Sequence, residues 1–296
     1  MQRIVSIVLL LFLLVGAAGW FYLQPKELPL GLAGDHLNVV FSVSDAAATR
    51  QFYGDILGLV ALPDVELLDG TLMLRYLAGK SELQFLVTSK DLPSFPGGTR
   101  NAHGIRLLAF LLPEDGQEGI LARMTAAGLE APALGGYEFG PFDIRIAMVR
   151  DYDDNQLELV FLDSLIPSFT HDQLQIGIGV SDMQAMDEFL ANTLSFEPSV
   201  IEGKTHRYEM GKTQIKYWQL EDDAPPWVGS PAEKSSMRLV QFPSKDILIT
   251  RDAIAARGGK IHAEPFTIPG LAEAMLVEGP DGMLFEFIEW FDKSTP

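Results

Sequence analysis

Apolar residues along most of this chain follow two spacings, every second position in short segments and helical spacing in longer ones. The first complete unit begins with an alternating segment at 37–43, which predicts a strand. Asp45 then caps a predicted helix that reaches about Leu57 and that Gly58 ends. Three more alternating segments follow. The unit therefore has the order strand, helix and three strands, written βαβββ.

The same order of elements is predicted four times between residues 36 and 291. The predicted strands lie at 37–43, 60–67, 71–77 and 82–88; at 105–112, 130–137, 143–149 and 156–162; at 174–180, 196–202, 205–210 and 213–220; and at 237–242, 261–268, 271–278 and 283–290. The predicted helices lie at 45–57, 116–127, 182–194 and 245–257. We name these units modules 1 to 4 in chain order.

Short motifs recur between the two halves of the chain. Val43-Ser44-Asp45 returns as Val180-Ser181-Asp182, Arg75-Tyr76 with Gly79-Lys80 returns as Arg207-Tyr208 with Gly211-Lys212, and Arg106-Leu107 returns as Arg238-Leu239. The last two recurrences have the same spacing along the chain, so we interpret the halves as a tandem repeat. The predicted domains are residues 34–168, with modules 1 and 2, and residues 172–292, with modules 3 and 4.

A polar turn precedes the last strand of modules 2 and 4. It runs R-D-Y-D-D-N-Q-L-E-L-V from Arg150 to Val160, and E-G-P-D-G-M-L-F-E-F from Glu278 to Phe287. This pattern resembles the D-P-D-G-N-x-x-E signature that closes a βαβββ module in the vicinal oxygen chelate superfamily, which includes glyoxalase I, extradiol dioxygenases and bleomycin-resistance proteins. The matching residues are Asp151, Tyr152, Asp153, Asp154, Asn155 and Glu158 in module 2, and Asp281, Gly282 and Glu286 in module 4, while Gly279 and Met283 depart from it.

The resemblance implies an α+β fold in which consecutive modules form two tandem pairs, each curled into a half-open barrel around a cavity. It also implies that the first and last strands of each module place ligand-binding residues in that cavity. These positions are Asn38, Glu82, Leu107 and Glu158 in the first pair, and Gln175, Gln214, Leu239 and Glu286 in the second. Arg75 and Arg207 are expected to be ordinary strand-face residues. If they point inward, they would neutralise Glu82 or bind an anionic ligand.

The expected ligand-binding positions argue against the metal ion that members of the family commonly bind. Leucine cannot ligate a metal, and none of the positions carries the histidine that an iron, zinc or nickel site needs. We therefore favour no cofactor. The alternative is a divalent metal ion held by Glu82 and Glu158 with a displaced His36 or His103.

An almost unbroken apolar run at 4–23 opens the chain. About 20 apolar residues are enough to cross a bilayer as a helix, and the closing Trp20, Phe21 and Tyr22 suit the membrane interface. We favour an uncleaved anchor within residues 1–25 over a signal peptide cleaved near 15–17. The globular part would then be exported, periplasmic or extracellular, and held at the membrane.

Composition restricts the possible partners. The formal net charge of −18 argues against nucleic acid, which binds surfaces rich in lysine and arginine. The absence of cysteine excludes disulfides, a thiol nucleophile and a thiolate metal site. The sequence contains no glycine-rich phosphate loop, nucleophile elbow or H-E-x-x-H motif, so it assigns no catalytic residue.

These observations lead to three hypotheses for function. The favoured one is a membrane-anchored, metal-independent binding protein whose first cavity, lined by Asn38, Glu82 and Glu158, holds a small polar or cationic molecule. The second is a metal-dependent enzyme of the glyoxalase or extradiol dioxygenase type, a lyase or an oxygenase. The third is a non-catalytic interaction module whose cavities are filled by Leu107 and Leu239. Stoichiometric divalent metal in protein purified without chelator would separate the second hypothesis from the others.

Overall fold

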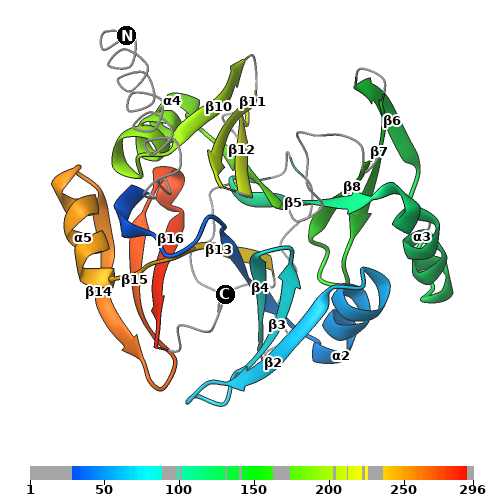
Figure 1. The fold of residues 1–296 in the computed structure, drawn as a ribbon, viewed down its shortest axis with the longest axis horizontal. Coiled ribbons are helices and arrows are strands. Elements are labelled where there is room, and N and C mark those ends of the chain that lie inside the picture. The colour runs from blue at the N-terminus through cyan, green and yellow to red at the C-terminus, as the bar shows by residue number, and fades with distance from the viewer. Residues whose placement is uncertain are drawn as a thin grey trace, which may run out of the picture.

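The computed structural model describes residues 29–88, 99, 102–130, 132–139, 142–162, 174–202, 205–211, 213–221, 224–225 and 236–291. Its elements confirm the four predicted βαβββ modules (Figure 1). Module 1 contains β1 (Asn38–Val43), a helix formed by α2 (Ala46–Thr49) and η2 (Arg50–Ile56), β2 (Val60–Glu66), β3 (Leu72–Ala78) and β4 (Ser81–Val87). Module 2 contains β5 (Gly104–Pro113), η3 (Glu114–Gly116), α3 (Gln117–Ala126), β6 (Leu134–Phe139), β7 (Phe142–Arg150) and β8 (Gln156–Leu162).

The second half of the chain repeats this order. Module 3 contains β9 (Leu174–Val180), a helix formed by α4 (Met183–Glu188) and η4 (Phe189–Thr193), β10 (Glu197–Glu202), β11 (Thr205–Met210) and β12 (Thr213–Gln219). Module 4 contains β13 (Ser236–Pro243), α5 (Ile247–Ala256), β14 (Lys260–Ile268), β15 (Ala272–Glu278), η5 (Pro280–Gly282) and β16 (Leu284–Trp290). A short turn, η1 (Pro29–Gly31), precedes module 1.

Most element boundaries lie close to the predicted ones, because local signals mark them. The Asp45 side chain accepts hydrogen bonds from the N–H groups of Ala47 and Ala48, as an N-cap does. The largest difference is β6, which begins at Leu134 rather than near residue 130. Pro132 lies just before this strand, and a proline has no N–H to donate to the strand ladder.

The strands form two eight-stranded mixed sheets, and the modules that share a sheet differ from the predicted pairs. One sheet has the order β14-β15-β16-β13-β1-β4-β3-β2, and the other has the order β10-β11-β12-β9-β5-β8-β7-β6. Module 1 therefore joins module 4 through the antiparallel pair β1 and β13, and module 2 joins module 3 through β5 and β9. In Figure 1 the blue and cyan strands lie beside the orange and red ones, and the yellow-green strands lie beside the green ones.

The predicted pairing of consecutive modules in a half-open barrel is therefore wrong. Alternating side chains determine which face of a strand is buried, but any strand edge offers the same backbone N–H and C=O groups to a partner. The predicted domains 34–168 and 172–292 describe the repeat along the chain, whereas the sheets combine strands from both halves. The superposition of these halves on one another stays a prediction.

The two modules within each half of the chain, 1 with 2 and 3 with 4, contact each other through the polar turn instead of through a shared sheet. Ser44, which precedes the module 1 helix, donates from Oγ to Asp153 Oδ1 in the module 2 turn at 2.9 Å. In the same way, the backbone N–H of Ser181 donates to Asp281 Oδ2 in the module 4 turn at 2.9 Å. The repeated Val-Ser-Asp motif and the signature turn are thus the two sides of one contact.

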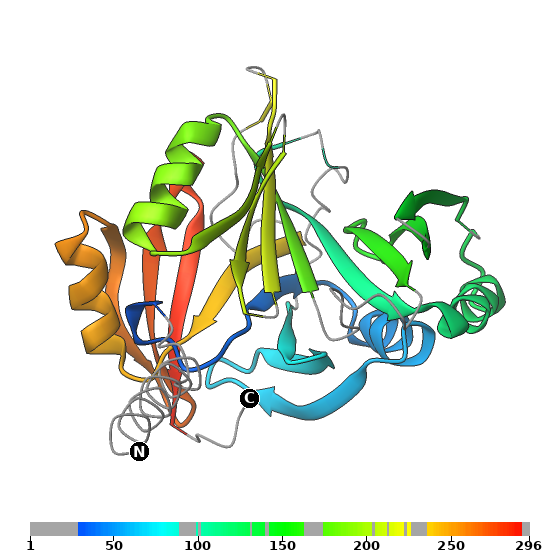
Figure 2. The same cartoon turned by 45° about the horizontal axis from the view of Figure 1, so that its top comes forward.

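The helices and one face of each sheet enclose a common apolar core. Phe41 and Phe85 stack in module 1 with ring centroids 4.5 Å apart, and Phe242 and Phe287 stack in module 4 at 4.7 Å. Figure 2 shows α5 and α3 at opposite ends of the molecule; α5 lies against the strands of its own module, and α3 lies beside η2 of module 1. The opposite face of each sheet carries the polar residues considered below.

The predicted membrane segment, 4–23, lies outside the described residues. Among the residues that the structure describes, no helix is long and apolar enough to cross a bilayer. The chain reaches module 1 along the start of α5, where Thr250 Oγ1 donates to the carbonyl oxygen of Leu30 at 2.8 Å.

Candidate functional site

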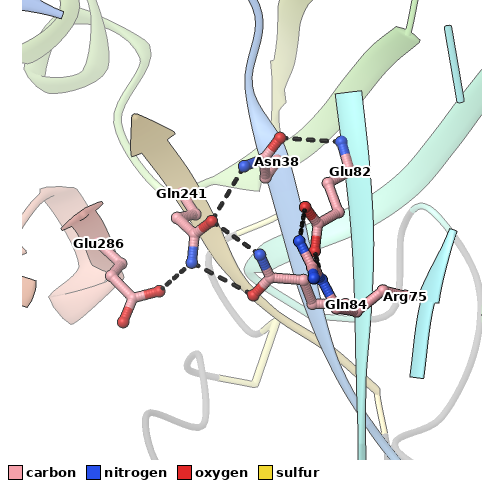
Figure 3. A network of polar contacts seen from close by, with 6 residues as sticks. All are labelled: Asn38, Arg75, Glu82, Gln84, Gln241 and Glu286. Atoms are coloured by element: carbon pink, nitrogen blue, oxygen red, sulfur yellow. Dashed lines mark hydrogen bonds and ion pairs between the residues drawn. The ribbon is translucent and has the colours of Figure 1, made fainter. Parts of the chain in front are cut away.

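In each sheet, polar side chains gather where two modules meet, at β1 and β13 in one sheet and at β5 and β9 in the other. They lie on the sheet face opposite the helices. On β1 the side chains of Val39, Phe41 and Val43 enter the core, so Asn38 projects from the other face. The register places Asn38 opposite Gln241 of β13, and Gln241 opposite Glu286 of β16. We name the following six residues centre 1: Asn38, Arg75, Glu82, Gln84, Gln241 and Glu286 (Figure 3).

Hydrogen bonds connect the residues of centre 1 in one buried network (Figure 3). Asn38 Nδ2 donates to Gln241 Oε1 at 3.0 Å, and Gln241 Nε2 donates to Glu286 Oε2 at 2.8 Å. Gln84 Nε2 donates to the same Gln241 oxygen at 3.0 Å, and the backbone N–H of Glu82 donates to Asn38 Oδ1 at 2.8 Å. With the further bond from Gln241 Nε2 to Gln84 Oε1, every amide oxygen of the centre already accepts an N–H.

Arg75 supplies the positive charge of centre 1. Its Nε and Nη2 donate to the two oxygens of Glu82 at 2.5 and 2.9 Å, which is a bidentate pair. Glu82 is fully buried and Arg75 is 9% exposed, so solvent screens this pair little. The guanidinium also lies over Trp290, with its carbon 5.7 Å from the ring centroid. Burial raises the pKa of Glu286, while its hydrogen bond from Gln241 opposes that shift.

The residues predicted for one cavity are divided between the two sheets. Asn38 and Glu82 lie with Glu286 in the sheet of modules 1 and 4, whereas Glu158 lies with Gln175 in the sheet of modules 2 and 3. The expected pair of carboxylates, Glu82 and Glu158, is therefore not formed. The cause is the module pairing, because β8 is not a strand of the sheet that contains β4.

Two of the predicted positions are also displaced by two residues along their strands. Gln241, not Leu239, lies opposite Asn38, and Ala109, not Leu107, lies opposite Gln175. In module 4 the connection from strand to helix is shorter, since Gln241 lies five residues before the N-cap Asp246 while Asn38 lies seven before Asp45. The spacing of seven residues between Asn38 and its helix cap would select Leu239 in module 4. The amide Gln241, two residues further along the same strand face, is the sequence signal for the true position.

The equivalent residues of the other sheet, all polar except Ala109, are named centre 2: Ala109, Glu158, Gln175, Arg207, Gln214 and Lys216. Lys216 Nζ donates to Glu158 Oε2 at 2.6 Å, and both side chains are largely buried. Gln175 Nε2 donates to Gln214 Oε1 at 3.0 Å, and Gln214 Nε2 donates to Glu209 Oε1 at 3.0 Å. Like Glu82, Glu158 is therefore paired with a basic side chain of the protein itself.

A pocket of about 460 Å³ opens beside centre 2. Its lining includes Leu107, Thr205, Arg207, Lys216, Trp218 and Leu220. The indole Nε1 of Trp218 donates to the carbonyl oxygen of Thr99 at 2.8 Å, which fixes the ring plane. A Cβ atom on Gly177 would lie 3.0 Å from this ring, so the glycine leaves room for the indole. Leu107 therefore forms part of the apolar wall of this pocket.

The donors of the two centres do not fit a catalytic divalent metal ion. Glu82 is committed to Arg75 and Glu158 to Lys216, and a buried cation next to a carboxylate opposes a second cation. His36 and His103 are buried outside both networks, and burial lowers the pKa of His36. Among the described residues, no group of three or more histidine, aspartate and glutamate side chains is placed to hold a metal.

The second half of the chain matches a known family. Residues 172–287 match the model of the Glyoxalase/Bleomycin resistance protein/Dioxygenase superfamily. This match confirms the resemblance to that superfamily for the part of the chain that contains modules 3 and 4.

Solved structures share the fold over most of the chain. Glyoxalase I from Zea mays has a TM-score of 0.61 and 15% sequence identity, with 85% of this chain and 91% of that chain covered. A mutant of the same enzyme has a TM-score of 0.64 at 14% identity, covering 85% and 92%. The cppA protein from Streptococcus pneumoniae has a TM-score of 0.50 at 12% identity, covering 86% and 98%. No curated protein matches the chain in sequence. At these identities the likeness establishes the fold.

Proposed function

We propose that the protein binds a small molecule without a metal ion. One observation carries this proposal, namely that each centre contains its own cation. The Arg75 guanidinium holds both oxygens of Glu82, and the Lys216 ammonium lies 2.6 Å from Glu158. A metal at either centre would have to displace a bonded basic side chain and leave its charge buried, which is costly.

The pocket beside centre 2 is the binding site in this proposal. Its volume of about 460 Å³ falls in the usual range for small-molecule sites, and it combines apolar walls with a few polar side chains. The network of centre 1 instead satisfies its own polar groups. The expected cationic ligand depended on Glu82 and Glu158 sharing a cavity, and each now has a protein cation as its partner. We therefore move the proposed site from the first cavity to modules 2 and 3.

The proposed location is the outer face of a membrane, with the apolar run at 4–23 as an anchor. The length and aromatic end of that run support this part of the proposal. Expression of the full chain and of a variant lacking residues 1–25, followed by membrane fractionation, tests it. The full chain should pellet with membranes and the shortened chain should not. A mature N-terminus near Ala18 in soluble exported material would contradict the anchor.

Metal analysis of protein purified without chelator tests the central proposal. We expect less than stoichiometric divalent metal, and we expect a chelator to leave the melting temperature unchanged, because no native-state ligand is removed.

Mass spectrometry of small molecules released on denaturation then searches for a bound organic ligand. Stoichiometric metal, with a melting temperature that falls in chelator, would favour the alternative of a metal-dependent enzyme of the glyoxalase or dioxygenase type, whose fold the chain shares. A chain that releases no ligand and binds none would favour the interaction module.

A further inference from the structure

Comparison of the two centres reveals an arginine that has lost its partner. Arg75 and Arg207 occupy the same place in the repeat, on β3 and β11. Arg75 pairs with Glu82, the second residue of β4, but the second residue of β12 is Gln214. Within the part of the chain that the structure describes, the Arg207 guanidinium makes no hydrogen bond or ion pair. Module 3 thus retains the cation without the carboxylate.

Arg207 also lies directly opposite a second cation. The register of β11 and β12 pairs Arg207 with Lys216, and both line the pocket. Like charges opposite each other on neighbouring strands are destabilising. Glu158 offsets the charge of Lys216, whereas Arg207 has no paired carboxylate among the described residues, although the exposed Glu221 also lines the pocket.

The rest of the pocket suits the apolar part of an organic molecule. Trp218 presents its ring beside Arg207 and is held in place by its bond to Thr99. Leu107 and Leu220 are both buried and add aliphatic surface. An aromatic ring held by the protein is a good surface for stacking a planar group.

We infer that this pocket binds a small organic carboxylate, with the carboxylate on Arg207 and a planar apolar portion against Trp218. The inference rests on the proposed function and names the chemical class of its ligand. Centre 1 shows the same kind of contact with a carboxylate that belongs to the protein itself. There, Arg75 donates from Nε and Nη2 to the Glu82 carboxylate. The ligand in centre 2 supplies the carboxylate that Gln214 does not. Arginine is suited to this role because its planar donors match the two carboxylate oxygens.

Phenylacetate and its neutral counterpart phenylacetamide are the probes for the test. The two have similar shapes and differ in charge, so their difference measures the contribution of the carboxylate. Titration calorimetry on the full-length chain should show saturable binding of phenylacetate, with an affinity at least about tenfold higher than that of phenylacetamide. The preference should weaken as salt is added, since Arg207 is exposed to solvent.

Two variants test the role of Arg207. Arg207→Gln should reduce the affinity for phenylacetate by about tenfold or more and should abolish the preference over the amide. Gln214→Glu should also block binding, because it restores the arrangement of Arg75 and Glu82. Arg257→Gln, which removes an equal charge at the end of α5 outside this pocket, should leave binding unchanged. The melting temperature of each variant verifies that it is folded.

The possible results separate this inference from the proposed function. Equal affinities for phenylacetate and phenylacetamide would support the pocket as a binding site but would overturn the assignment of a carboxylate to its ligand. Unchanged affinity in Arg207→Gln would overturn the role of Arg207. Absence of binding by either probe at millimolar concentration would overturn the inference. The metal content and the released ligand test the proposed function independently.

Discussion

At the scale of single residues, one difference changes the chemistry of a whole centre. Arg75 has Glu82 within hydrogen-bond distance, while the equivalent Arg207 faces a strand that carries Gln214. The first arginine is therefore buried in a closed ion pair, and the second is exposed at a pocket. Modules 1 and 3 have thereby diverged, so that centre 1 is a structural centre and centre 2 is a candidate binding centre.

The Arg75 and Glu82 pair leads to a stability prediction. Glu82→Gln leaves a buried guanidinium without its counter-charge, so the free energy of unfolding should fall by about 3–5 kcal/mol. Urea unfolding followed by circular dichroism measures this change. Glu66→Gln, on the exposed strand β2, is the control and should change stability by less than about 0.5 kcal/mol. A Glu82→Gln protein more stable than the wild type would contradict the pairing.

Asp151 leads to a pH prediction. Burial raises its pKa from 3.8 to about 6, although Asn155 and Tyr53 donate hydrogen bonds that oppose the shift. The folded protein therefore binds this proton more tightly than the unfolded chain does. The resulting stabilisation is fully present below pH 3.8 and is lost as the pH rises through about 6.

Asp151→Asn removes the titrating group and serves as the comparison for that effect. The stability of the wild type relative to this variant should fall by about 2 kcal/mol between pH 4.5 and 7.5, in proportion to the pKa shift. Urea unfolding at a series of pH values measures the difference. A difference that does not vary with pH would show that Asp151 has an ordinary pKa.

At the scale of elements, the polar turn has a structural role that its family resemblance did not suggest. The turns before β8 and β16 accept hydrogen bonds from the serines that precede the helices of modules 1 and 3. Arg123 of α3 adds a second link, since its Nε donates to the carbonyl oxygen of Ile56 at the end of η2. Neighbouring modules that share no sheet are thus joined by helix ends and turns.

Removal of this contact tests its contribution. Asp153→Ala leaves the hydroxyl and backbone N–H of Ser44 without their acceptor, so stability should fall by about 1–3 kcal/mol. Asp64→Ala, which breaks an exposed ion pair with Arg50, should cost less than about 1 kcal/mol. Both values come from denaturant unfolding. Equal losses in the two variants would mean that the contact between turn and helix stabilises the protein no more than an exposed ion pair does.

At the scale of the whole molecule, each sheet requires both halves of the chain. Strands β1 and β5 are central strands because β13 and β9 pair with them. Without modules 3 and 4, each would become an edge with unpaired N–H and C=O groups. The chain therefore differs from a tandem of two independent domains, even though its sequence repeats as one.

A fragment tests this interdependence. Residues 34–168, expressed alone, should fail to unfold cooperatively as a monomer and should associate through the exposed edges of β1 and β5. Size-exclusion chromatography and urea unfolding measure both properties. Residues 29–296 are the positive control and should be monomeric and cooperative. A stable, cooperative monomer of the fragment would show that β1 and β5 can pair with each other.

The sequence by itself determined the four modules, the ends of most helices and the repeat, because alternation, caps and glycine ends act over a few residues. The family resemblance of its motifs, rather than alternation alone, indicated Asn38, Glu82 and Glu286 as cavity residues, and these three lie together in centre 1. Only the tertiary structure decided which modules share a sheet. It thereby separated Glu82 from Glu158, paired each with a basic residue and placed Arg207 at a pocket. The physical reason is that backbone groups on strand edges are alike, so the choice of partner depends on the packing of the whole chain.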